Sequence, residues 1–109
     1  MTGYIFQATL ATIHNSAENK IVADLVGSEK AWIGGFSRDG NIFFWPNSSD
    51  TKMNYQNWNF REPNNSGGNE YCVEIYGSKR GSGADGKWND NTCNKPDGYV
   101  CETSRDTIG

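Results

Sequence analysis

Two groups of acidic and amide side chains stand out because their oxygen atoms could hold a hard cation. The first group is Glu62, Asn64 and Glu70, in a segment that Pro63 stiffens and that two glycines allow to curl back on itself. Calcium selects such ligands, binding about six to eight oxygens at ~2.3–2.6 Å. Taken alone, the segment is more typical of a polar surface turn, since Asn, Gly, Pro and Ser dominate turns.

The second group is Asn89-Asp90, which lies between Trp88 and Cys93. A disulfide between Cys72 and Cys93 would tie the strand that follows the first group to the segment that carries the second. Carboxylates and carboxamides from both groups could then converge, and this mixture suits calcium better than magnesium, which demands octahedral geometry and retains water. Open coordination positions could accept the vicinal hydroxyls of a sugar, because amides donate to a hydroxyl and carboxylates accept from it.

The composition limits the class of protein. A chain of 109 residues is long enough for one domain, and we expect residues 1–109 to form a single one. The net charge is −3 and no run of Lys and Arg exceeds two residues, which argues against nucleic acid as a partner. No apolar run approaches the ~20 residues of a membrane span, so membrane insertion is not expected.

The cysteines indicate an oxidising compartment. Cys72, Cys93 and Cys101 form no Cys-x-x-Cys pair and the only histidine is His14, so a zinc site is not expected. One disulfide with one thiol left over fits this count and implies a secreted or extracellular domain of a larger or processed protein. The odd number means that the domain is incomplete or that one cysteine pairs outside the chain.

One capped helix and several short strands are predicted around these groups. Ser16 can cap the helix, Ile21, Val22, Leu25 and Val26 form one apolar face, and Gly27 ends it. Residues 1–13 fit either a helix or a strand, and residues after Thr103 resemble a frayed tail. Residues 46–72 form a long loop, and such loops are usually functional when aromatic anchors pin them. The fold class is therefore α+β, with strands at 31–36, 41–45, 70–76, 87–90 and 99–102.

Short motifs spread along the chain occur in a defined order: Trp32-Ile33-Gly34-Gly35, Tyr55-x-x-Trp58, Glu62-Pro63-Asn64, Glu70-x-Cys72, Trp88-Asn89-Asp90, Cys93 and Val100-Cys101-Glu102. In this order they resemble the C-type lectin domain, and the similarity covers residues 6–102. Residues 10–13 and 17–19 resemble the end of that domain's first helix and the start of its second.

The resemblance implies a C-type lectin-like fold, with one or two helices, short antiparallel strands and a long calcium-binding loop. It implies that Cys72 pairs with Cys93 and that Pro63 follows a cis peptide bond. The Glu-Pro-Asn triplet resembles members that bind mannose-type sugars, which are mannose, N-acetylglucosamine, glucose and fucose. The residues expected to hold both the calcium and the sugar are Glu62, Asn64, Glu70, Asn89 and Asp90.

The chain departs from the family pattern near its N-terminus. We expect the N-terminal strand and most of the first helix to be missing, and Gly3 stands near the place of that helix's cysteine. Cys101 would then be unpaired, or it would link two chains in a homodimer. Asn65 stands where members with an auxiliary calcium often have an acid, which argues against a second ion.

The resemblance favours calcium-dependent binding of mannose-type glycans. The alternative is a C-type-lectin-like domain that binds a protein or ice, with a purely structural calcium. Members of that kind commonly lose one or more ligand positions, whereas this chain keeps all of them. An enzyme is not expected: Glu62 and Glu70 could be argued as a glycosidase pair, which needs two carboxyl groups ~5–9.5 Å apart, but ligands of an ion cannot also serve freely as proton donors.

Overall fold

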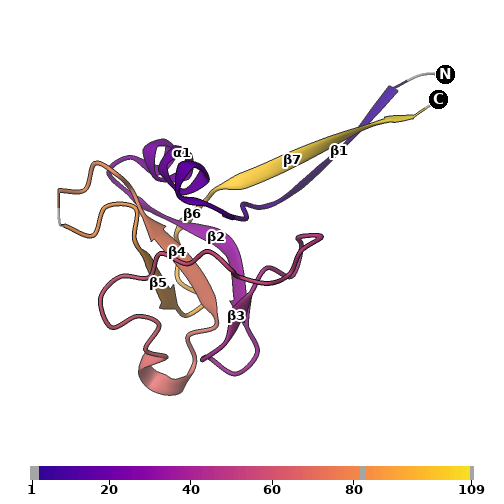
Figure 1. The fold of residues 1–109 in the computed structure, drawn as a ribbon. Helices are drawn as coiled ribbons and strands as arrows, with labels where there is room; N and C mark the ends of the chain where they lie inside the picture. Colours follow the sequence, from indigo (N-terminus) through magenta and orange to yellow (C-terminus); the bar gives the residue numbers. More distant parts are fainter. Residues whose placement is uncertain (1–2, 82, 109) are drawn as a thin grey trace.

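A helix packed against a small, mainly antiparallel sheet forms the body of the computed structural model, which describes residues 3–81 and 83–108 (Figure 1). The sheet has the strand order β3-β2-β4-β5, and β6 pairs with β2 in parallel. This arrangement confirms the predicted α+β class. The elements are β1 (Gly3–Leu10), α1 (Ser16–Val26), β2 (Lys30–Ser37), β3 (Phe43–Phe44), the 3-10 turn η1 (Ser66–Gly68), β4 (Cys72–Tyr76), β5 (Trp88–Asn91), β6 (Gly98–Tyr99) and β7 (Cys101–Ile108).

Helix α1 is capped by Asn15, so the prediction that Ser16 caps it is wrong. The Asn15 side chain accepts a hydrogen bond from the backbone N–H of Glu18 at 2.9 Å, and Ser16 is the first helical residue. Gly27 ends the helix with φ 67°, and its N–H donates to the carbonyl of Ala23, so the predicted end is confirmed.

The buried face of α1 differs from the predicted apolar face. Val22 is buried, but Ile21 is 62% exposed and Leu25 is 74% exposed. The reason is a polar contact: Asn19 is buried, and its Oδ1 accepts a hydrogen bond from Trp88 Nε1 at 2.8 Å. This contact turns α1 so that Asn19 faces the core and Leu25 faces outward.

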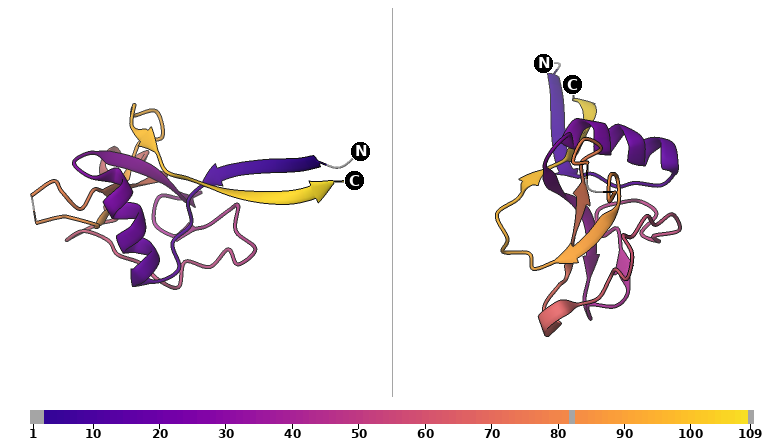
Figure 2. Two further views of the ribbon diagram at one scale, coloured as in Figure 1. Left: turned by 90° about the horizontal axis from the view of Figure 1, so that it is seen from above. Right: turned by 90° about the vertical axis from the view of Figure 1, so that its left-hand side faces the viewer.

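Strands β1 and β7 form a two-stranded antiparallel arm that extends from the body (Figures 1 and 2). Two predictions for the chain ends are therefore wrong: Gly3–Leu10 is a strand where the N-terminal strand was expected to be missing, and β7 continues to Ile108 where a frayed tail was expected. Residues 11–13 are not helical either, and α1 is the one α-helix among the residues described. Pairing of strands about a hundred residues apart leaves no local pattern that could have predicted it.

Aromatic rings from the long loop and from Trp45 just before it pack around Trp88 in the centre of the core. Trp88 of β5 is fully buried, and its ring centroid lies 5.6 Å from that of Trp45, 5.9 Å from Tyr55 and 5.7 Å from Trp58. Trp45, Tyr55 and Trp58 all precede the segment that begins at Glu62. The loop is therefore held to the end of the sheet by these rings and by backbone hydrogen bonds that Trp88 makes with Asn57 and Asn59.

Strands β4 and β5 are joined by a ladder and by a covalent bond. Their register places Cys72 opposite Asn91, Val73 opposite Asp90 and Glu74 opposite Asn89. The predicted disulfide between Cys72 and Cys93 is confirmed, with the two Cα atoms 5.2 Å apart, and Cys101 is free and exposed. The disulfide fixes β4 to the segment that follows Asn89 and Asp90.

Candidate functional site

The end of β5 meets the long loop through the carboxylate of Asp90. Asp90 is fully buried, and its Oδ1 and Oδ2 accept hydrogen bonds from the backbone N–H groups of Asn64 at 3.2 Å and Asn65 at 2.7 Å. The peptide bond between Glu62 and Pro63 is cis, as the family resemblance implied. These contacts bring the two groups of residues found in the sequence into one place.

The loop then curls so that Glu70 returns to the same point. The backbone N–H of Ser66 donates to Glu70 Oε1 at 2.8 Å and to Asn64 Oδ1 at 3.1 Å, and the N–H of Glu70 donates to Asn65 Oδ1 at 2.9 Å. The 3-10 turn η1 forms the tip of this curl, at the end of the body away from the β1–β7 arm (Figures 1 and 2). Four of the five predicted ligands therefore lie close together: Glu62, Asn64, Glu70 and Asp90.

Three carboxylates crowd together at this point, and none of them belongs to an ion pair recorded in the described parts of the chain. Burial, a hydrogen bond with Asp90 and repulsion from Asp90 and Glu70 together raise the pKa of Glu62 to about 7. The pKa of Glu70 is also raised, by burial first and by repulsion from Asp90 and Glu74. Glu62 Oε1 is buried, and it has no hydrogen-bond partner among the residues that the structure describes. A cation would relieve both the repulsion and this unpaired oxygen.

The donor set fits calcium in its chemistry. Within residues 3–81 and 83–108, no group of three or more His, Cys, Asp or Glu side chains is placed so that it could hold a metal ion, and oxygens of Asp90 and Glu70 accept backbone N–H groups. The set nevertheless consists of hard oxygen donors, carboxylates and carboxamides, which calcium prefers. Glu62 Oε1 is a buried acceptor still available to an ion.

The fifth predicted ligand, Asn89, faces a different partner. Successive strand residues point to opposite faces, and Asn89 lies opposite Glu74 in the ladder, whereas Asp90 lies opposite Val73. Asn89 Nδ2 donates to Glu74 Oε1 at 2.8 Å. In the described parts of the chain, no hydrogen bond joins Asn89 to any of the other four predicted ligands.

Glu74 is the polar residue that the sequence reading missed. It is fully buried, and Lys95 Nζ donates to its Oε2 at 2.7 Å and also pairs with Asp97. Burial alone would raise the pKa of Glu74, but hydrogen bonds from Asp97, Lys95 and Asn89 outweigh burial and lower it to about 2. The available signal was an acid between Val73 and Ile75 in a buried strand, because such a charge needs a partner.

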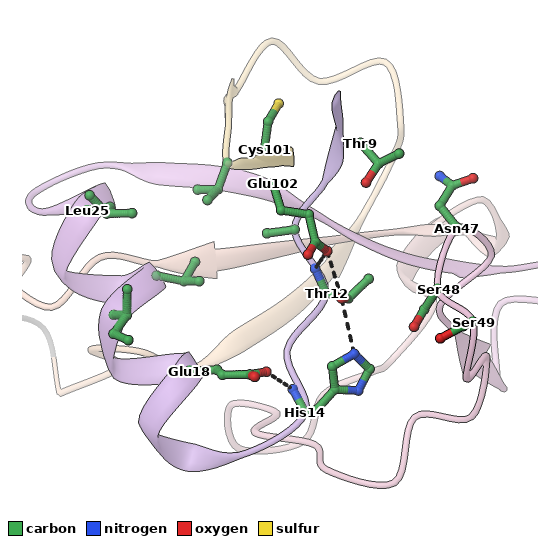
Figure 3. Close-up of a pocket in the computed structure, with 14 residues that line it drawn as sticks. Thr9, Thr12, His14, Glu18, Leu25, Asn47, Ser48, Ser49, Cys101 and Glu102 are labelled. Atoms are coloured by element: carbon green, nitrogen blue, oxygen red, sulfur yellow. Dashed lines mark hydrogen bonds between the residues drawn. The ribbon is translucent and has the colours of Figure 1, made fainter. Parts of the chain in front are cut away.

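A separate pocket of about 560 Å³ lies between α1, the start of β7 and residues 47–49 (Figure 3). Its carboxylates already have partners: Glu18 accepts from the N–H of His14, and Glu102 accepts from both the N–H and the hydroxyl of Thr12. None of the five predicted ligands lines it. The pocket is therefore distinct from the acidic cluster.

The calcium-free protein should lose stability as the pH rises toward neutrality. The folded protein raises the pKa of Glu62 from 4.5 to about 7, so it binds this proton more tightly than the unfolded chain does. The stability that Glu62 contributes is present below pH 4.5 and is lost as the pH rises through about 7. Urea unfolding in EDTA should show the free energy of unfolding falling across this range, and the Glu62→Gln variant should show a flatter profile. A free energy of unfolding of the wild type that rises across the same range would contradict the placement of Glu62 beside Asp90 and Glu70.

The sequence matches the family described as "Lectin C-type domain" over residues 5–103. Among curated relatives, the chain is 34% identical over 104 residues to asialoglycoprotein receptor 2 of Rattus norvegicus, with 91% of this chain and 32% of that protein covered. It is 38% identical over 92 residues to ladderlectin of Oncorhynchus mykiss, with 79% and 45% covered. The chain thus spans less than half the length of these relatives. No helix within the described ranges is long and apolar enough to cross a membrane.

Solved structures share the fold. The EPNH mutant of CEL-I is 25% identical with a TM-score of 0.73, covering 91% of this chain and 70% of that one. At 22% identity, a calcium-independent type II antifreeze protein has a TM-score of 0.62, covering 93% of this chain and 68% of that one, which shows the fold alone. With the family match, the relatives and the arrangement of strands all in agreement, the chain belongs to the C-type lectin domain family.

Proposed function

We propose that this protein binds carbohydrate through a calcium ion held by Glu62, Asn64, Glu70, Asn89 and Asp90. The observation that carries the proposal is the convergence of three carboxylates that pair with no Lys or Arg in the described parts of the chain, with Glu62 Oε1 buried and lacking a hydrogen-bond partner there. Burying an unpaired carboxylate is costly, and this cost is most simply explained by a cation that the site is built to receive.

The bound ion and the side chains of the site would each bind the hydroxyls of a sugar. Bound calcium supplies open coordination positions to which two neighbouring hydroxyls can bind. Carboxylates such as Glu62 and Glu70 accept hydrogen bonds from those hydroxyls, and the amide of Asn64, which is exposed, can donate one. The protein's part is to orient the hydroxyl pair, so no bond in the sugar is broken and we propose no enzymatic activity.

The proposed sugars are of the mannose type: mannose, N-acetylglucosamine, glucose and fucose. Support comes from the Glu62-Pro63-Asn64 triplet, whose letters match the EPN of the EPNH mutant of CEL-I. Binding to ice without calcium is not proposed, because the similarity to the antifreeze protein extends only to the fold.

We expect mannose coupled to polyacrylamide to retain the protein in calcium and to release it when EDTA is added. Polyacrylamide is chosen because agarose is itself a galactose polymer. Galactose on the same support serves as the control and should retain less. Retention that persists unchanged in EDTA, or no retention in calcium, would exclude this mechanism.

The double substitution Glu62→Gln with Asn64→Asp is expected to shift preference from mannose toward galactose. It exchanges an acid and an amide across the cis proline, so the total number of donors and acceptors is kept while their positions are reversed. A glycan array in calcium should show the change as an inverted ratio of mannose to galactose signals. An unchanged ratio would mean that these residues do not select the hydroxyls.

We also propose that the protein is secreted or extracellular and that Cys101 links two copies in a homodimer. The disulfide Cys72–Cys93 supports an oxidising setting, in which the exposed thiol of Cys101 would find a partner. Non-reducing electrophoresis of protein secreted from cells should show a dimer that Cys101→Ser abolishes.

A further inference from the structure

Glu74 of β4 contacts Asn89 of β5 from directly across the ladder. Asn89 Nδ2 donates to Glu74 Oε1 at 2.8 Å, and Asn91 Nδ2 donates to the same oxygen at 3.1 Å. Glu74 is fully buried, so its carboxylate depends on these donors and cannot turn to water instead. The contact is therefore a fixed feature of the sheet and not a surface encounter.

The contact decides which end of the Asn89 amide is left for a ligand. A carboxamide has a donor end, Nδ2, and an acceptor end, Oδ1, and only the acceptor end can bind a cation. A carboxylate accepts but cannot donate, so Glu74 binds the Nδ2 end only. The Oδ1 end is then directed away from Glu74, and in the described parts of the chain no donor binds it.

Lys95 fixes the other oxygen of the Glu74 carboxylate. Its Nζ donates to Glu74 Oε2 at 2.7 Å and also lies 3.1 Å from Asp97 Oδ1. Trp32 Nε1 donates to the backbone carbonyl of Lys95 at 3.1 Å, which fixes the lysine to β2. The chain of contacts from β2 through Lys95 and Glu74 ends on Asn89.

We propose that Glu74 is a positioning residue that sets calcium affinity by orienting the Asn89 amide, with its Oδ1 presented to the ion. This inference rests on the proposed function, because it assigns a purpose to a contact beside the calcium ligands. Partners that orient a metal ligand from behind typically change metal affinity by ~10–100-fold when removed. A buried ion pair that only stabilised the fold would change the melting temperature and leave calcium affinity alone.

The test compares three variants by calcium titration in a calorimeter and by melting temperature in EDTA. Glu74→Gln can donate its own amide to Asn89 and so turn Oδ1 away from the ion, and it should weaken calcium binding ~10–100-fold. Glu74→Gln with Asn89→Asp exchanges the acid and the amide, and should restore the affinity to within about threefold, because either oxygen of a carboxylate can then face the ion. Asp97→Asn is the matched control: it alters the same network without contacting Asn89, and should leave the affinity within about twofold.

Equal calcium affinity in wild type and Glu74→Gln would overturn the inference, whereas absence of binding in the wild type would overturn the proposed function instead. If Glu74→Gln shows no cooperative melting in EDTA, the exchanged pair decides the question. Restored calcium binding in that pair supports the positioning role. Failure of this double variant to fold or to bind calcium contradicts the positioning role, since that result is expected if the contact between Glu74 and Asn89 only stabilises the fold.

Discussion

Calcium is expected to stop stabilising the protein when Glu62 is replaced by glutamine. At a calcium concentration about 100 times Kd, binding should add ~2.7 kcal/mol to the free energy of unfolding of the wild type. Glutamine keeps the size of the side chain but removes the charge, and the affinity should fall by about 100-fold or more, since a charged ligand of the ion is lost. The variant should therefore gain almost nothing from the same calcium.

Without calcium the order of stability of the wild type and Glu62→Gln should reverse. This reversal distinguishes a calcium ligand from an acid that only stabilises the fold. In EDTA at pH 8, Glu62→Gln should be at least as stable as the wild type, because it removes a half-buried charge that Asp90 and Glu70 repel. Thermal melts in calcium and in EDTA measure both effects. Glu29→Gln, an exposed acid on the connection after α1, is the control and should change neither melt. A Glu62→Gln variant that is less stable in EDTA and still gains stability from calcium would contradict the assignment.

Trp88→Ala should cause a large loss of stability in the calcium-free protein, ~3–5 kcal/mol, as is typical for deleting a buried tryptophan. Trp88 is fully buried against Trp45, Tyr55 and Trp58, so its removal leaves a cavity where the long loop meets β5. It also leaves the buried Asn19 Oδ1 without the donor that it binds at 2.8 Å.

Urea unfolding in EDTA measures this loss, and Trp88→Phe provides the matched comparison. Phenylalanine keeps most of the ring contacts but cannot donate to Asn19, so its loss should be smaller than that of alanine. Calcium affinity should fall in Trp88→Ala as well, because Asn89 and Asp90 follow Trp88 directly in β5. A loss below ~1 kcal/mol would mean that the rings do not hold the loop.

Local patterns in the sequence predicted most of the body. β2 was predicted from an apolar run, β4 from the alternation of its residues, and the end of α1 from Gly27. The short strand β5 was also predicted. The disulfide between Cys72 and Cys93 followed from the family resemblance and is confirmed. These features depend on residues close together in the chain or on motifs whose order is distinctive.

The features that were predicted wrongly or missed depend on contacts between distant residues. The β1–β7 arm requires Gly3–Leu10 to meet Cys101–Ile108, and no short-range pattern reports such pairing. The outward position of Leu25 follows from the contact of Asn19 with Trp88, which overrides the apolar spacing of α1. Glu74 was missed because its partner, Lys95, lies 21 residues away in an irregular segment.

The candidate site could be predicted in its chemistry but not in its full geometry. The oxygen donors and their convergence near Asp90 agree with the spacing of the motifs. The division between Asp90, which faces the loop, and Asn89, which faces Glu74, follows from the alternation of a strand whose register the sequence does not specify.

The most direct test of the account is a calorimetric titration of methyl mannoside into the protein, first with saturating calcium and then with EDTA. The account predicts a measurable heat of binding in calcium that disappears in EDTA and is absent from Glu62→Gln under both conditions. Binding of equal strength in EDTA, or undiminished binding by Glu62→Gln in calcium, would contradict a sugar held through a calcium ion at this site.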